Sequence, residues 1–449
     1  MNSKEICKLA PIEKCCQITE TTLLLLDDMA LFAIMKYLNI IALSHLFATC
    51  KRLKILVCAH VQKHHTNVHW MRYMKSEVNS IGPRESEEVF RNFGKYIRTI
   101  RLTSWSSFEF YEILLLVAQE CTHIDTLILE SVRMSRPQLL CDPLIKLMFK
   151  KLKRFVLSGC YWQGWCPLNN FFGDNETLED LAVTNCCAYN GRNYRLHMSG
   201  FRSLKKLRLL RCRNVVTGKE LVACFENNNI KSVMLSDIGN VHVFLDNVIE
   251  CLSDTVDDLS VDFCNEINSN QLSRLKKLRT LRLHCNTHTD MDEFLSNVST
   301  GSAIEELFIV RVCISSQTIE ALKQFKNLKR LKMDRSLNSV PRQFFRAIPK
   351  ILPQLQHFVY TNSTIRDEDI LYMFNLMPQL ARLCLFGCNS LATETYLEMA
   401  DILENDWHRP KVEFILPKFE TVKSLQDVKN IKKKLWLRTD IAVICPRSL

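Results

Sequence analysis

The chain has 449 residues, 47% of them hydrophobic and 24% charged, which is the composition of a folded protein. Its 11 glycines and 12 prolines are too few for long flexible linkers, and no apolar run approaches the length of a membrane span. The formal net charge of +11 leaves an acidic protein or a nucleic acid open as the partner. Twenty cysteines behind a charged N-terminus without a signal-peptide core predict free thiols in a reducing compartment, the cytoplasm or the nucleus.

After an N-terminal tail at 1–21, residues 22–70 predict three short helices, at 28–37, 42–48 and 51–59. Asp27 precedes the first helix and is expected to cap it through its carboxylate. A segment of this size is too small to bury a core alone, so part of its apolar surface is expected to contact a partner. The residues that we expect on that surface are Leu26, Leu31, Ile34, Leu38, Leu43 and Leu46.

A small group of potential metal ligands stands near the end of this segment: Cys58, His60, His64 and His65. A zinc site would require paired, closely spaced ligands, and no second pair accompanies this group. We therefore interpret these histidines as surface residues at a helix end, and we expect neither a metal nor a cofactor.

A linker and N-terminal cap at 71–94 lead into an internal repeat of the form apolar-x-x-apolar-x-apolar. The unit recurs twelve times at steps of 22 to 28 residues, within the range of leucine-rich repeats. Its last two apolar residues alternate with a variable one, as in a half-buried strand, and helical spacing follows between units. This predicts an α/β fold, a right-handed leucine-rich-repeat solenoid of about twelve repeats over 95–417 with a C-terminal cap and tail at 418–449. The first apolar residues of the units are Ile97, Ile124, Leu152, Leu178, Leu204, Ile230, Val256, Leu278, Ile304, Leu328, Leu355 and Leu380.

Five units carry a cysteine three residues after the last strand position: Cys160, Cys186, Cys212, Cys264 and Cys388. The leucine-rich consensus has Asn or Cys at this place. A small side chain fits the tight turn there, and its thiol can meet a carbonyl of the neighbouring coil. We therefore predict a buried structural ladder in preference to reactive or metal-binding thiols.

The N-terminal segment and the repeats together resemble a known family. Residues 26–39, with the sequence Leu-Asp-Asp-Met-Ala-Leu-Phe-Ala-Ile-Met-Lys-Tyr-Leu-Asn, look like the first half of an F-box. Trp70 stands where many F-boxes end in an aromatic residue, whereas Asp27 and Ile40 occupy positions that are often proline. Over residues 22 to 417 the chain resembles the F-box and leucine-rich-repeat proteins. The second half of the F-box is represented by Leu43, Leu46, Cys50, Lys51 and Arg52.

This resemblance implies a substrate receptor of a Skp–cullin–F-box ubiquitin ligase. In that family the F-box binds the Skp adaptor, which links it to a cullin and a RING subunit. The repeats hold a protein substrate for ubiquitination and proteasomal degradation. A separate E2 enzyme does the chemistry, so the chain would supply proximity and would not itself be an enzyme. The alternative is a protein-binding repeat scaffold with a degenerate F-box that joins no ligase.

The sequence itself also argues against a catalytic role and against nucleic acid as the partner. The sequence has no phosphate-binding loop, nucleophile elbow, zinc-protease or dinucleotide motif. On the concave face predicted by strand alternation, acidic coils interrupt basic ones, so no continuous stripe for a phosphate backbone results. A lysine-rich stretch at 429–434 is interpreted as a solvated helix face in preference to a nuclear-import signal.

A protein substrate is therefore expected on the concave face, in the C-terminal half of the solenoid. This half combines arginines with exposed aromatic residues, which most often anchor protein interfaces, and its cations suit an acidic or phosphorylated partner. The predicted substrate-binding residues are Arg282, His284, Phe308, Arg330, Lys332 and Phe386.

Overall fold

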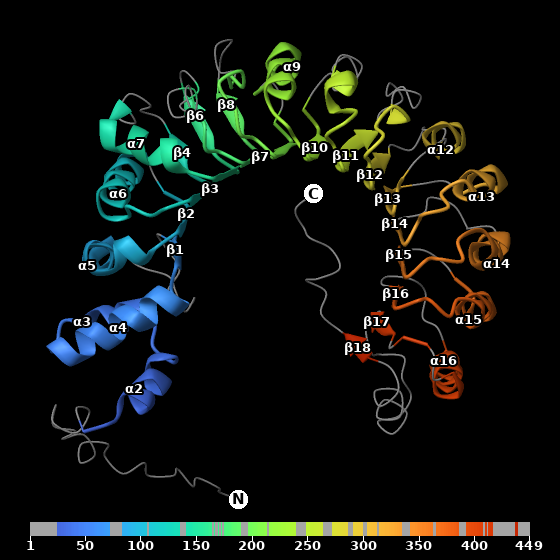
Figure 1. Ribbon diagram of the computed structural model, residues 1–449, viewed down its shortest axis with the longest axis horizontal. Coiled ribbons are helices and arrows are strands. Elements are labelled where there is room, and N and C mark those ends of the chain that lie inside the picture. The colour runs from blue at the N-terminus through green and yellow to red at the C-terminus, as the bar shows by residue number, and fades with distance from the viewer. Residues whose placement is uncertain are drawn as a thin grey trace, which may run out of the picture. The chain divides into compact units, whose positions relative to one another are not determined.

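A computed structural model (Figure 1) divides by its contacts into two compact units, Met1–Leu152 and Lys153–Leu449. It describes residues 25–71, 83–105, 107–134, 141–163, 166, 169, 172, 175–189, 196–212, 215–238, 248–263, 272–285, 291–299, 303–311, 314–334, 342–361, 365–385, 392–406, 409–410, 412–415 and 436–438. None of the helices in these ranges combines the length and the hydropathy that a bilayer crossing requires.

The first unit begins with three helices: α2 (Asp28–Met35), α3 (Ile40–Phe47) and α4 (Lys51–His64). Each begins after a residue whose side chain accepts a backbone N–H of the first turn, namely Asp27, Asn39 and Cys50. The capping role predicted for Asp27 is thereby confirmed. The last helix runs five residues further than predicted, because His60 and Val61 continue its buried side.

Three parallel strands follow in the same unit, and β1 pairs with β2 and β2 with β3. Trp70, which the sequence suggested as the end of the F-box, lies in β1 and is buried. The indole N–H of Trp105 donates to the Trp70 carbonyl at 3.4 Å. The strand ladder therefore begins inside the segment assigned to the F-box. The remaining elements are β1 (Asn67–Met71), α5 (Pro83–Phe93), η2 (Gly94–Tyr96), β2 (Thr99–Thr103), α6 (Ser107–Glu120), β3 (Thr126–Glu130), β4 (Arg133–Met134) and α7 (Pro143–Lys151).

The second unit is a ladder of parallel strands with helices between them. Its strands are β5 (Arg154–Ser158), β6 (Tyr161–Gln163), β7 (Asp180–Thr184), β8 (Cys187–Tyr189), β9 (Lys206–Leu210), β10 (Ser232–Ser236), β11 (Asp258–Phe263), β12 (Thr280–Cys285), β13 (Glu306–Val310), β14 (Arg330–Asp334), β15 (His357–Thr361), β16 (Arg382–Cys384), β17 (Glu413–Ile415) and β18 (Trp436–Arg438). Its helices are α9 (Gly218–Asn227), α12 (Met291–Ser299), α13 (Ser316–Leu322), α14 (Arg342–Ile351), α15 (Asp367–Leu376) and α16 (Thr393–Asn405). β6 and β8 pair with each other outside this ladder, in a separate small sheet. Within this unit the strands of the ladder line the inner side of the curve and these helices its outer side (Figure 1).

A strand lies at each of the twelve positions that the repeat predicted. The ladder is nevertheless longer than predicted, because β1, β17 and β18 add further parallel strands. These three strands lack the full apolar-x-x-apolar-x-apolar unit, so the pattern could not identify them.

A recurrent turn ends the strands and joins each coil to the next. The residue after the strand has a positive φ, between 47° and 62°, in the left-handed region. In several coils its N–H donates to the carbonyl of the last residue of the next strand, at 2.7–2.8 Å. Only one of the seven residues is a glycine, so the sequence carried no signal for this turn. They are Ser104, Ser131, Gly159, Asn185, Arg211, Asp237 and Arg311.

Three ladder cysteines, Cys160, Cys186 and Cys212, directly follow these turn residues and lie in the coil interior. The Cys186 thiol donates to the Leu157 carbonyl at 3.6 Å, and the Cys212 thiol to the Val183 carbonyl at 3.1 Å. Both carbonyls belong to the preceding coil, as predicted. Cys160, Cys186 and Cys212 are buried, and burial raises the pKa of the Cys186 thiol well above its usual value. The structural ladder is confirmed at these three positions, whereas Cys264 and Cys388 lie outside the described residues.

Candidate functional site

An exposed apolar stripe runs along α2, the first helix of the chain that the structure describes. The side of this helix that carries Leu31 and Met35 is buried. The opposite side leaves large apolar side chains in solvent: Leu25 is 83% exposed, Met29 78%, Ile34 40% and Tyr37 89%. We call these four residues the α2 stripe: Met29 and Ile34 lie on α2, and Leu25 and Tyr37 lie just before and just after the helix. Such a surface on a small helical segment marks a site for a partner.

The predicted adaptor-binding residues fall on both sides of this division. Ile34 is exposed, and Leu26, Leu38 and Leu46 are half-buried. Leu31 and Leu43 are buried among the helices, so neither side chain can contact a partner in this conformation. The sequence analysis did not single out Met29 and Tyr37. The spacing of Leu31 and Met35, four residues apart, was the signal that could have identified the inward side of the helix.

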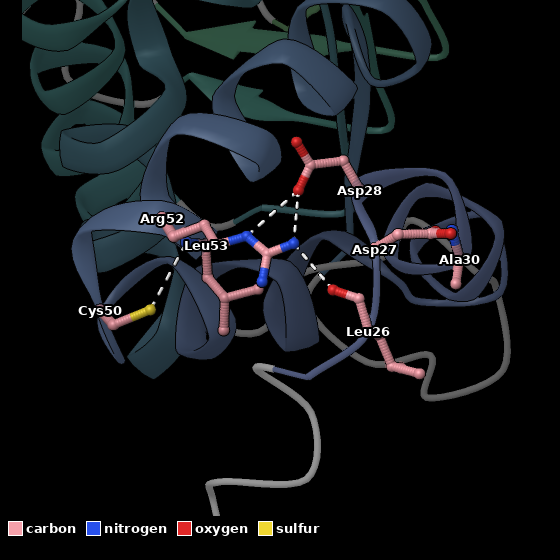
Figure 2. A network of polar contacts seen from close by, with 7 residues as sticks. All are labelled: Leu26, Asp27, Asp28, Ala30, Cys50, Arg52 and Leu53. Atoms are coloured by element: carbon pink, nitrogen blue, oxygen red, sulfur yellow. Dashed lines mark hydrogen bonds and ion pairs between the residues drawn. The ribbon is translucent and has the colours of Figure 1, made fainter.

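A polar network fixes the start of α2 on α4 (Figure 2). The Arg52 guanidinium donates to Asp28 Oδ1 from Nε at 3.1 Å and from Nη2 at 2.6 Å. The same Nη2 donates to the Leu26 carbonyl at 2.7 Å. Beside it, Asp27 caps the helix at 2.7 Å through the Ala30 N–H. Because the network holds the helix start from two directions, it presents the α2 stripe in a defined orientation.

The neighbouring helix α3 is anchored in turn on α5. Ser44 is buried, accepts from Asn92 Nδ2 at 2.9 Å and donates to Glu88 Oε1 at 3.4 Å. The rings of Phe47 and Phe93 meet edge to face, with centroids 5.3 Å apart. Helix α3 therefore packs on α5 through both polar and aromatic contacts.

Three histidines meet at the end of α4. The His60 ring is buried, so the interpretation of this residue as a surface histidine was wrong. It lies 4.8 Å from the ring of His64 and 5.4 Å from that of His65, centroid to centroid. Burial, together with the charges of His65, His64 and Lys36, lowers the pKa of His60 to about 4. His60 is therefore neutral at physiological pH. Among the residues that the structure describes, no group of three His, Cys, Asp or Glu side chains could hold a metal ion.

The second candidate site is the strand face of the second unit, formed by the outward-pointing residues of the parallel strands. The first outward residue of each strand forms one row, and these residues pair across neighbouring strands. Arg330 binds Glu306 at 2.7 Å, and Arg382 binds Glu413 at 2.5 Å. Asp180 pairs with Arg154 at 3.2 Å. It also pairs at 2.9 Å with Arg208, which belongs to the second row described below. Carboxylates of the face stand in this first row, where they neutralise arginines, and in a third row that holds Asp262 and Asp334.

The middle outward residues form a second row, the central row, which has a different character. Strand register places its members side by side, and none of them is acidic. Three are cations and most of the rest are apolar. From β5 to β16 they are Val156, Ala182, Arg208, Met234, Ser260, Arg282, Phe308, Lys332, Val359 and Cys384.

Of the predicted substrate-binding residues, Arg282, Phe308 and Lys332 lie side by side in the central row. The Arg282 guanidinium is paired with Asp258 and lies 5.1 Å from the centre of the Phe308 ring. Arg330 belongs to the first row, and the half-buried His284 follows Arg282 two residues along β12. Phe386 lies outside the described residues.

The structure is similar to a chain of the yeast Rad7 and Elc1 complex, with a TM-score of 0.40 and 11% sequence identity over 93% of this chain and 92% of that chain. A similarity of this size carries no conclusion about function. No protein-family model matches the sequence, and no curated protein matches it.

Proposed function

We propose that the protein is the substrate-recognition subunit of a Skp–cullin–F-box ubiquitin ligase. The helices α2, α3 and α4 would bind the Skp adaptor and, through it, the cullin and the RING subunit. The strand face would hold a protein substrate for ubiquitination. The chain itself contributes position and orientation, with no catalytic group of its own, and acts in the cytoplasm, the nucleus or both.

The observation that carries this proposal is the α2 stripe. Met29 is an exposed large apolar side chain on a helix whose start is bound by Arg52, and Tyr37 is exposed just beyond the end of that helix. Exposed apolar surface that is already held in one conformation loses little entropy when a partner covers it. An adaptor that buries this stripe fits both the exposure and the resemblance of residues 26–39 to the first half of an F-box.

The test is co-purification of the Skp adaptor and cullin with the tagged protein from cells. We expect Met29→Ser with Ile34→Ser to abolish retention of both, because each side chain is exposed and its loss spares the core. Leu31 is unsuitable for this test, since its substitution would damage the buried side of α2.

The matched control is Leu147→Ser on α7, which also removes an apolar side chain that is 51% exposed. This variant should retain the adaptor at the level of the unmodified protein. If the unmodified protein retains no adaptor but still captures a partner through its strand face, the scaffold with a degenerate F-box is the better assignment.

A further inference from the structure

The central row of the strand face offers a continuous strip from Arg208 on β9 to Lys332 on β14. Parallel strands lie about 4.8 Å apart, so the six residues of this strip extend over about 24 Å. The Arg208 side chain is 33% exposed and that of Arg282 24%, and Met234 and Phe308 are half-buried. Part of each of these four side chains therefore remains accessible, whereas Ser260, which stands between Met234 and Arg282, is buried.

Charge along the strip is one-sided although the face as a whole is nearly balanced. Carboxylates stand in the rows on both sides of it, Asp180, Asp258 and Glu306 in the first row and Asp262 and Asp334 in the third. Asp180 and Asp258 pair with the strip residues Arg208 and Arg282, whereas no carboxylate belongs to the strip itself. Between these cations stand Met234 and Ser260, and Phe308 separates Arg282 from Lys332. A ligand that follows the strip would therefore meet a cation, an apolar residue, a small residue, a cation, an aromatic ring and a cation.

The spacing favours separate carboxylates over a phosphate group. A phosphate is held by several cations that converge on it, whereas here Arg208 and Arg282 stand about 14 Å apart, three strands along the ladder. Both guanidinium groups already bind one carboxylate each within the chain, so their geometry suits that group.

We propose that this strip binds an extended protein segment in which glutamate or aspartate alternates with apolar residues on one side. The inference rests on the proposed function, because it names the class of substrate that the strand face would present. An extended chain advances about 3.3 Å per residue and points every second side chain to the same side. Nine residues therefore cover the strip, with acidic residues at the first, fifth and ninth places and apolar residues at the third and seventh.

The probe is the fluorescein-labelled peptide Glu-Ser-Leu-Ser-Glu-Ser-Leu-Ser-Glu, and its binding to the full chain is measured by fluorescence anisotropy at 50 mM salt. Binding should weaken about tenfold with Arg282→Gln and with Phe308→Ala, and less with Lys332→Gln. Asp258→Asn should tighten binding, because the Asp258 carboxylate then no longer competes with the peptide for Arg282. Circular dichroism confirms that each variant is folded.

The matched control is Arg382→Gln, which removes an arginine of the same face that is paired with Glu413 in the first row. This variant should bind the peptide unchanged, and a peptide with glutamine in place of glutamate should not bind. The proposal is overturned if the unmodified protein does not bind the peptide, or if Arg382→Gln weakens binding as much as Arg282→Gln. Tighter binding of a peptide with phosphoserine in place of glutamate, or of a single-stranded oligonucleotide, would also overturn it. None of these outcomes depends on the adaptor, so failure here and failure of the co-purification test are distinguishable.

Discussion

Individual side chains in this protein are placed by the turn that ends each strand. The left-handed residue at that turn sends the next side chain inward, and the thiols of Cys160, Cys186 and Cys212 occupy the space that results. The ladder was predictable from the sequence, since the cysteines recur at one place in the repeat. The backbone turn that places them was not, because serine, asparagine, arginine and aspartate occupy it as well as glycine.

For the ladder we predict that Cys212→Asp destabilises the protein by about 2 kcal/mol or more, because a carboxylate would be buried without a compensating partner. Cys212→Ser, which keeps a donor for the Val183 carbonyl, should lose less. Urea unfolding followed by circular dichroism measures both.

Thiol labelling of the native protein provides an independent check of the ladder. Cys141 is exposed and should react fast, whereas Cys186 and Cys212 should react only when the protein unfolds. Equal labelling rates for these three cysteines would contradict the structural role.

His60 makes the stability of the first unit depend on pH. Its pKa is about 4 in the folded state against an ordinary value of 6.5, so the unfolded state binds more protons between these values. The stabilisation is complete above pH 6.5 and is lost as the pH falls toward 4, with a loss on the order of 2 kcal/mol.

We expect urea unfolding at pH 7.5 and at pH 5.0 to show this loss, and His60→Phe to reduce it. The phenylalanine retains a ring beside Phe32 but cannot be protonated. An identical difference between the two pH values in both proteins would assign the effect to groups other than His60.

At the scale of the elements, the helices and strands were largely predictable, and their exposed sides were less so. Twelve strands and three N-terminal helices follow from apolar spacing, since that spacing records what each element buries. The partner-facing side of α2 was harder to predict, because Leu31 and Ile34 are both apolar residues of one short helix. Only the packing of α2 against α4 shows that Leu31 is buried and Ile34 is exposed. Likewise, pairing of Arg282 with Asp258 depends on the strand register between two consecutive coils, and the apolar pattern does not show which polar side chains meet across it.

The contact between α2 and α4 gives a prediction at this scale. Arg52→Ala should speed amide hydrogen exchange in residues 26–35, because the Asp28 and Leu26 contacts of the guanidinium are lost. The loss of global stability should stay near 1 kcal/mol, since the ion pair is largely exposed.

The control is Arg91→Ala, which removes an arginine that pairs with Glu87 within α5 and links no two helices. Its exchange in residues 26–35 should match that of the unmodified protein. Unchanged exchange in Arg52→Ala would mean that apolar packing alone holds α2 in place.

For the whole molecule, the repeat predicted the class of fold and most of its extent. The ends were assigned less well, because β1, β17 and β18 pair with their neighbours through the backbone while their side chains depart from the repeat. A sequence repeat arises where successive coils pack their side chains in the same way. Terminal coils have a neighbouring coil on one side only, so their side chains need not follow the repeat. Both candidate binding surfaces depend on what each unit leaves uncovered, which apolar periodicity does not record.

The hydrogen bond that several turns make to the next strand also bears on how such a protein can evolve. Because a coil brings its own strand, its turn and its inward side chain, duplication of the gene segment for one coil would add a unit without redesign of the others. Each duplication would lengthen the strand face by about 4.8 Å, and with it the segment that the face can hold. Point mutations in the central row would then adapt the new coil, so length and specificity can change in separate steps.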